Sequence, residues 1–202
     1  MEIQRKYKYL FILYRVGKTC ILNQYVKNQF SLSYKITVGA DFLTKEIKKE
    51  QDTLHLQIWD TAGSERFHSI TAGFYRNTEV CILVFDQTNL ESFEQVDVWR
   101  NEFLEVLNPP EGENFPFVLL GNKSDRKDEI KVKQEDIDNY CQKHNNMPYF
   151  SVSALNNSNI EEAFNKIADM ALIRNTKNED IILPEIKPIQ IEKPPEKKKC
   201  CF

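Results

Sequence analysis

Four short polar stretches carry residue types that can bind a phosphorylated base, and each follows an apolar run that reads as a strand. The first is Gly17-Lys18-Thr19, flanked by Val16 and Cys20, ahead of a helix-like stretch. Backbone N–H groups at a helix start point toward an anion. The Lys18 ammonium can meet β- and γ-phosphates, and the Thr19 hydroxyl can bind Mg²⁺. Alone, this tripeptide is a common chance match.

The second stretch, Trp59–Gly63, ends a predicted strand. Asp60 can hold Mg²⁺ through water, and the N–H of Gly63 can face a γ-phosphate. An Asp at a strand end also serves as a turn or helix cap, so this stretch alone leaves both interpretations open.

The third and fourth stretches are suited to a purine base. In Gly121–Asp125, the Asp125 carboxylate can accept from both N1–H and N2–H₂ of guanine, a pair that adenine lacks. Asn122 can contact the base edge or brace the loop, and the Lys123 stem can lie over the ring. The backbone N–H groups of the fourth stretch, Ser153-Ala154-Leu155, can meet the guanine O6.

The elements that must position these loops alternate between strand and helix patterns. The predicted strands are Tyr7–Leu13, Phe42–Lys49, Thr53–Trp59, Glu79–Asp86, Phe115–Lys123 and Tyr149–Val152. The predicted helices are Lys18–Lys27, Glu91–Leu107, Lys133–His144 and Ile160–Ile173. This alternation predicts an α/β fold with a six-stranded, mostly parallel sheet. Open sheets of this kind bind ligands at the carboxyl ends of their strands, so the four loops form one joint signal.

Length and composition fit a single domain. The chain has 202 residues, of which 41% are hydrophobic, enough for a sizeable core. Its net charge of −3 argues against a nucleic-acid partner. Five cysteines without scaffold spacing fit a reducing compartment. No apolar run has the length of a signal peptide or a membrane span, so a cytosolic body is expected.

Together these residues resemble Rab-type small GTPases of the Ras superfamily, most closely the late-endosome and lysosome subfamily. The segments that carry the resemblance are Thr37–Phe42, Leu56–Gly63, Arg66–Thr71, Phe74–Glu79 and Leu83–Thr88. The resemblance implies the P-loop small-GTPase fold, with helices on both faces of the sheet, over residues 5–173. It also implies that the chain binds GTP or GDP with Mg²⁺, exchanges GDP for GTP and hydrolyses GTP.

The resemblance assigns further roles. Thr37 would place its hydroxyl on Mg²⁺ and its N–H on the γ-phosphate, Phe30 would flank the guanine, and Tyr34 would close over the phosphates. Phe42, Trp59 and Phe74 would form an aromatic patch that effectors bind; the alternative is that these three aromatic residues belong to the core. The whole effector surface would comprise Val38, Gly39, Asp41, Phe42, Trp59 and Phe74. An exchange factor and a GTPase-activating protein are the other implied partners.

Two departures from the family pattern affect the chemistry. A phosphate loop needs a glycine five residues before Gly17, where this chain has Ile12, and the loop is two residues shorter than in the family. Genuine divergence and a wrong exon boundary both explain this shortening. Ser64 stands where the family has the glutamine that orients the attacking water, so unaided hydrolysis is expected to be slow. Leu155 also replaces a lysine, with some loss of packing over the base.

Residues 174–202 read as an extended tail, rich in proline and charge. Cys200 and Cys201 resemble the cysteines that carry geranylgeranyl groups in Rab proteins, and two lipid chains give stable membrane anchoring. Lys197–Lys199 can attract anionic lipid or simply be solvated. The apolar stretch Pro188–Ile191 resembles the segment that docks on escort and GDP-dissociation-inhibitor proteins.

Two functional hypotheses follow. The first is a prenylated Rab-like switch on the cytosolic face of late endosomal, lysosomal or phagosomal membranes. The second is a pseudo-GTPase, a membrane-tethered binding module with weak or lost nucleotide binding, which the shortened loop and Ser64 favour. A P-loop kinase is excluded because no stretch resembles a lid for an acceptor substrate.

Overall fold

The computed structural model describes residues 4–12, 16–31, 40–49, 52–61 and 75–179. Residues 13–15 of the shortened loop and the tail from residue 180 lie outside these ranges. So do nine of the predicted site residues, namely Tyr34, Thr37, Val38, Gly39, Gly63, Ser64, Phe74, Cys200 and Cys201. Their roles stay predictions.

One six-stranded sheet organises the chain, with the strand order β2-β3-β1-β4-β5-β6. The strands are β1 (Gln4–Ile12), β2 (Ala40–Lys49), β3 (Asp52–Thr61), β4 (Val80–Asp86), β5 (Phe117–Asn122) and β6 (Tyr149–Ser151). Only β2 runs antiparallel to its neighbour, β3, and every other pair is parallel. The predicted α/β fold with a mostly parallel sheet is confirmed.

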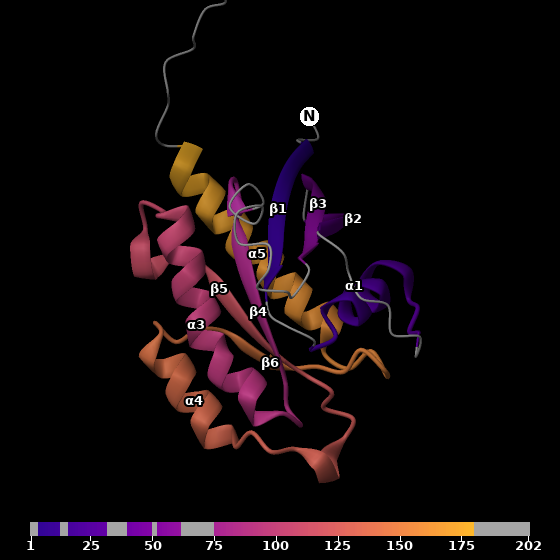
Figure 1. The fold of residues 1–202 in the computed structure, drawn as a ribbon. Helices are drawn as coiled ribbons and strands as arrows, with labels where there is room; N and C mark the ends of the chain where they lie inside the picture. The colour runs from indigo at the N-terminus through magenta and orange to yellow at the C-terminus, as the bar shows by residue number, and fades with distance from the viewer. Residues whose placement is uncertain (1–3, 13–15, 32–39, 50–51, 62–74, 180–202) are drawn as a thin grey trace, which may run out of the picture.

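Helices cover both faces of this sheet (Figure 1). The α-helices are α1 (Lys18–Lys27), α3 (Leu90–Leu107), α4 (Gln134–Lys143) and α5 (Ile160–Glu179), and the short 3₁₀ turns are η2 (Gly112–Asn114) and η3 (Lys127–Glu129). The ring of Phe93 on α3 meets that of Tyr140 on α4 at 5.8 Å, so these two helices share one face. On the other face, Tyr25 of α1 stacks on Phe164 of α5, with ring centroids 3.6 Å apart.

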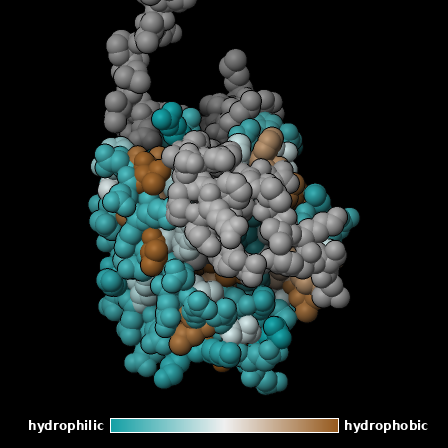
Figure 2. All heavy atoms as spheres, in the orientation of Figure 1, coloured by the Kyte–Doolittle hydropathy of each residue, from teal (hydrophilic) through white to brown (hydrophobic). Residues whose placement is uncertain are grey.

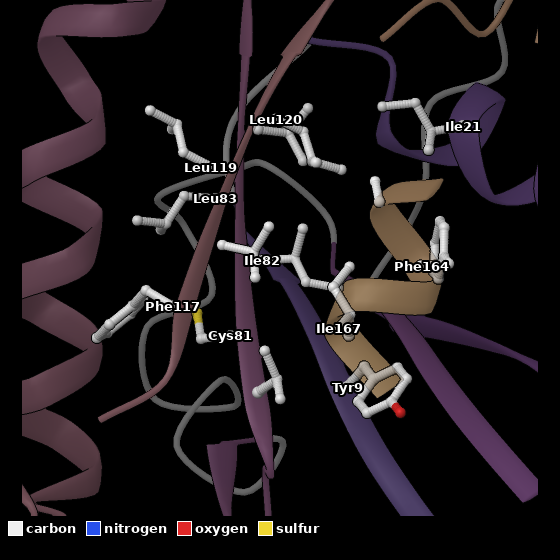
Figure 3. Packing of buried hydrophobic residues seen from close by; sticks show 14 of the residues in the cluster. Tyr9, Ile21, Cys81, Ile82, Leu83, Phe117, Leu119, Leu120, Phe164 and Ile167 are labelled. Atoms are coloured by element: carbon white, nitrogen blue, oxygen red, sulfur yellow. The ribbon is translucent and has the colours of Figure 1, made fainter. Parts of the chain in front are cut away.

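The core lies along β4 and β5, which are buried over their whole length. Successive side chains point to opposite faces of a strand, so each of these two strands contributes side chains to both helical layers. In Figure 3, Cys81 and Leu83 point toward α3, whereas Ile82 points toward α5. Continuous burial explains why β4 and β5 read in the sequence as unbroken apolar runs rather than as alternating ones.

Two element ends differ from the sequence-based expectation by three residues or more. The strand β1 begins at Gln4, three residues earlier than expected, because its first residues continue the parallel ladder with β3. The helix α5 continues to Glu179, six residues beyond the expected end at Ile173. Arg174 accounts for part of this extension. Its guanidinium lies 3.1 Å from the Glu79 carboxylate, 2.9 Å from that of Glu111, and over the Phe115 ring.

The described surface in Figure 2 is mostly hydrophilic, with separate apolar spots rather than one broad apolar band. Within the described ranges, no helix combines the length and the apolar character needed to cross a membrane.

The packing of α3 generates a stability prediction. The Phe103 ring is fully buried and meets the rings of Tyr75, Phe115 and Phe117. Replacing it by alanine (Phe103→Ala) should lower the free energy of unfolding by about 3–5 kcal/mol, because the surrounding rings cannot fill the cavity. Urea denaturation at a fixed ligand concentration measures this change. Val98→Ala, at an exposed position of the same helix, should change the value by less than about 0.5 kcal/mol.

Candidate functional site

The four polar loops meet at the carboxyl edge of the sheet, as expected for a parallel arrangement. Gly17 precedes α1, Asp60 lies near the end of β3, Asn122 is the last residue of β5, and Ser153 comes two residues after β6. These strands occupy neighbouring or near-neighbouring places in the sheet order. Residues separated by more than a hundred positions in the chain therefore share one site.

The phosphate end of the site is built on Gly17 and the start of α1. Gly17 has φ +90°, a left-handed conformation that side chains rarely adopt. A Cβ atom there would also lie 2.7 Å from Nδ2 of Asn122. Lys18, the first helical residue, is 6% exposed, and burial lowers the pKa of its ammonium while the charge of Asp60 opposes that shift. A buried cation beside a helix N-terminus suits a phosphate chain.

The second residue of α1 bears on the predicted metal position. The Thr19 hydroxyl donates a hydrogen bond to the carboxylate of Asp60, which is buried. Hydroxyl and carboxylate oxygens are the ligands that Mg²⁺ prefers, so this pair fits the metal. The described part of the chain contains no group of three or more His, Cys, Asp or Glu residues that could hold an ion. A Mg²⁺ ion here would need further oxygens, such as those of a bound phosphate chain.

The Asn122 side chain joins the phosphate end to the base end. Its Nδ2 donates to the carbonyl of Val16 at 2.8 Å, and its Oδ1 accepts from the N–H of Ala154 at 3.2 Å. Asn122 is almost fully buried. Of the two interpretations open from the sequence, contact with a base edge or bracing of the loop, the described contacts are those of a brace.

The base end is organised by Ser153. Its hydroxyl donates to the carboxylate of Asp125 and accepts from the N–H of Leu155 at 3.2 Å. The N–H of Ser153 itself donates to the carbonyl of Ser158 at 3.2 Å. Every N–H predicted to meet a guanine O6 thus already has a partner, so a base oxygen would have to share or replace one of them. The Leu155 side chain is 54% exposed.

Asp86, which contacts Lys123, is a site residue that the sequence analysis did not identify. The Lys123 backbone is left-handed, with φ +65°, and its ammonium forms an ion pair with the carboxylate of Asp86 at the end of β4. Burial alone would raise the pKa of Asp86, but hydrogen bonds from Lys123 and Thr88 bring the pKa below its usual value. The available signal was a carboxylate directly after an unbroken apolar strand.

The remaining described site residues lie around this centre. Phe30 is half-buried and packs against the core, and Cys20 is half-buried, which raises the pKa of its thiol. On the hairpin of β2 and β3, the Phe42 ring is 49% exposed and stacks on Trp59, with centroids 5.2 Å apart. Asp41 lies on the same strand, β2.

The amino-acid sequence is similar to known proteins over most of its length. The model of the Ras family matches residues 13–173. A Ras-related protein Rab-7b from Paramecium octaurelia is 44% identical over 189 residues, which cover 92% of this chain and 91% of the relative. The Ypt/Rab-type GTPase ypt7 of Schizosaccharomyces pombe is 45% identical, with 92% and 90% covered. The Ras-related protein RABG3f of Arabidopsis thaliana is 48% identical, with 84% and 83% covered.

The chain belongs to the Ras family, whose members are guanine-nucleotide-binding GTPases. Within that family it is of the Rab type, the regulators of membrane traffic that its relatives represent. Membership implies, in general terms, partners of four kinds: effectors, exchange factors, GTPase-activating proteins and GDP-dissociation inhibitors.

The geometry of Gly17 generates a prediction with a matched control. In Gly17→Ala, the left-handed backbone should cost about 1–2 kcal/mol, and crowding of Asn122 should add about 1–3 kcal/mol. Gly112 also has positive φ, +55°, but nothing lies within 4 Å of a Cβ built there. Gly112→Ala should therefore show only the backbone cost. Urea unfolding of both variants measures the difference, and equal losses would contradict the close approach of Asn122.

Proposed function

We propose that this chain is a GTP/GDP switch that regulates vesicle traffic toward late endosomes and lysosomes. The bridge that Asn122 makes between the Val16 carbonyl and the Ala154 N–H carries this proposal. One amide holds a phosphate-type loop and a base-type loop in a fixed relation, which a nucleotide spanning the two requires. The direction of traffic rests on similarity to proteins named Rab-7 and ypt7.

Within the proposed site, each residue has a defined task. Lys18 would hold the β- and γ-phosphates, and Thr19, Asp60 and Thr37 would hold Mg²⁺. When bound, Mg²⁺ neutralises the charge that develops on the phosphates. Because Thr37 also contacts the γ-phosphate, loss of that group releases its segment, and the switch changes state.

The Asp125 carboxylate selects guanine. Its hydrogen bond from the Ser153 hydroxyl holds the carboxylate in place beside the base-facing loop. Lys123 lies over the ring, and Phe30 and Tyr34 close around the nucleotide. The set is completed by Val16, Gly17, Cys20, Gly63, Ala154 and Leu155.

Hydrolysis proceeds by direct attack of water on the γ-phosphate, without a covalent intermediate. The chain contributes positioning and positive charge, chiefly through the Lys18 ammonium. Ser64 is too short to orient the water as glutamine does, so the unaided reaction is slow. A GTPase-activating protein that brings its own catalytic side chains restores the rate.

Two further surfaces complete the proposed cycle. The stacked rings of Phe42 and Trp59 are partly exposed, as suits aromatic anchors of an effector surface. That surface also includes Val38, Gly39, Asp41 and Phe74. The nucleotide-binding domain, expected over residues 5–173, extends through α5 to Glu179, and residues 180–202 form the tail. Geranylgeranyl groups on Cys200 and Cys201 anchor the tail to the membrane, and Pro188–Ile191 docks on the escort protein and the GDP-dissociation inhibitor.

One observation favours the alternative of a pseudo-GTPase. The stretch before Gly17 is two residues shorter than in the family and lacks the glycines that let the backbone pass close to the phosphates. Nucleotide binding separates the two candidates directly.

The purified full-length chain should contain guanine nucleotide close to one mole per mole of protein. In Asp125→Ala, loss of two hydrogen bonds to the base should weaken GDP binding by at least about a hundredfold, because bonds to a charged group contribute about 1.5–3 kcal/mol each. Extraction and chromatography quantify the bound nucleotide, and fluorescent GDP titration gives the affinity. Asp138→Ala, at an exposed position on α4, serves as the control. A folded protein without nucleotide that ignores added GTP and GDP would favour the pseudo-GTPase.

The substitution Ser64→Gln should accelerate unaided hydrolysis by about tenfold or more, because the longer amide can orient the attacking water. Single-turnover release of phosphate from the preloaded GTP complex measures the rate. GDP affinity should stay the same, since Ser64 has no assigned contact with the diphosphate. An unchanged rate would show that the missing glutamine is not what limits hydrolysis here.

A further inference from the structure

We propose that Gln87, together with its neighbour Asp86, positions the guanine-binding loop and thereby sets how well the protein discriminates between bases. The inference rests on the proposed function, since it concerns the same site. Neither residue belongs to the four polar stretches that identify the site in the sequence. Both lie at the carboxyl end of β4, next to the end of β5 in the sheet.

The Gln87 backbone holds both ends of the loop that carries Lys123 and Asp125. Its N–H donates to the carbonyl of Asn122, at the entrance of the loop, at 3.1 Å. Its carbonyl accepts from the N–H groups of Lys131 and Val132, at the exit, at 2.9 and 3.2 Å. A loop whose two ends are bonded to one residue has lost much of its freedom before a base binds.

The Gln87 side chain extends this attachment across the sheet. It is 5% exposed, and its Nε2 donates to the carbonyl of Gly121 on β5 at 2.8 Å and to the Ser151 hydroxyl oxygen on β6 at 3.1 Å. Gly121 leaves room for this path, because a Cβ there would lie 3.0 Å from Cγ of Gln87 and 2.8 Å from the Tyr149 hydroxyl. One amide therefore ties β4 to the last residues of β5 and β6, just before the two base-facing loops begin.

Asp86 holds the side chain of Lys123, which lies inside the loop. Its carboxylate accepts from the N–H of Thr88 at 2.9 Å and from the Thr88 hydroxyl at 2.7 Å, which hold it in place. It then pairs with the Lys123 ammonium, whose stem is expected to lie over the base. The loop is also held internally, where the N–H of Arg126 donates to the Lys123 carbonyl at 3.0 Å.

These contacts make Gln87 and Asp86 positioning residues rather than ligand contacts. The Asp125 carboxylate must meet N1–H and N2–H₂ at once, so a small shift of its loop loses the second bond before the first. Inosine diphosphate lacks the 2-amino group and reports that bond alone. Loosening the loop should thus reduce the preference for GDP over inosine diphosphate, whereas general destabilisation should weaken both nucleotides alike.

The test uses the full-length chain and the variant Gln87→Met, which keeps the length of the side chain and removes its donor. The ratio of the Kd for inosine diphosphate to that for GDP should fall by about threefold to tenfold, as expected for impaired hydrogen bonding. Asp86→Asn should lower the same ratio, and Asp86→Glu should restore part of it. The matched controls are Gln95→Met on the exposed face of α3 and Asp128→Asn in η3, and both should keep the wild-type ratio.

Hydrogen exchange provides a second measurement that needs no nucleotide. Backbone amides of residues 123–132 should exchange faster in Gln87→Met than in the wild-type chain, while amides of α3 stay unchanged. An unchanged ratio with unchanged exchange would overturn the inference. If the wild-type chain binds no guanine nucleotide, the proposed function fails, but faster exchange in residues 123–132 would still demonstrate the brace and unchanged exchange would refute it.

Discussion

The whole site depends on one buried amide, that of Asn122. Its side chain accepts from Ala154 and donates to Val16, residues that lie 32 and 106 positions away in the chain. A buried amide with a lost partner is costly, because the remaining groups cannot bond to water instead. The loops before α1 and after β6 are therefore held together by the same few atoms. This also explains why Gly17 is a glycine, since any side chain there would collide with the Asn122 amide.

At the phosphate end of the site, the buried charge of Lys18 is offset by a nearby carboxylate rather than by solvent. Lys18 is buried beside Asp60, and burial depresses the pKa of the ammonium even with that carboxylate nearby. Such a pair is expensive to maintain in a closed core and suits a place where an anion completes the charge balance. The base end follows the same principle, since Lys123 is held by Asp86 and Asp125 by Ser153. Lys123 and Asp125, two groups expected to contact the nucleotide, are thus each held by a neighbouring side chain.

Much of the fold and the location of the candidate site could be predicted from the sequence. The unbroken apolar runs of β4 and β5 indicated buried parallel strands, and the polar residues after them indicated a ligand edge. The ends of elements were harder to predict: α5 continues past its amphipathic pattern to Glu179, and the ion pairs of Arg174 with Glu79 and Glu111, which account for part of this extension, are not visible in any local pattern. Asp86 and Gln87 were missed for a similar reason. In the sequence they belong to Leu83–Thr88, a segment that carries the family resemblance but assigns them no role, and only the neighbouring strand β5 shows what they contact.

The sequence by itself determined the family, the fold and the residue types at the site, because apolar periodicity and short loop motifs are local properties of the chain. Only the tertiary structure decided which atoms meet. That Asn122 braces two loops, that Lys123 pairs with Asp86, and that Gln87 holds both ends of the base loop depend on the order and register of the strands. Strand order places β4 beside β5 and β5 beside β6, and this proximity is a property of the packed sheet rather than of any segment alone.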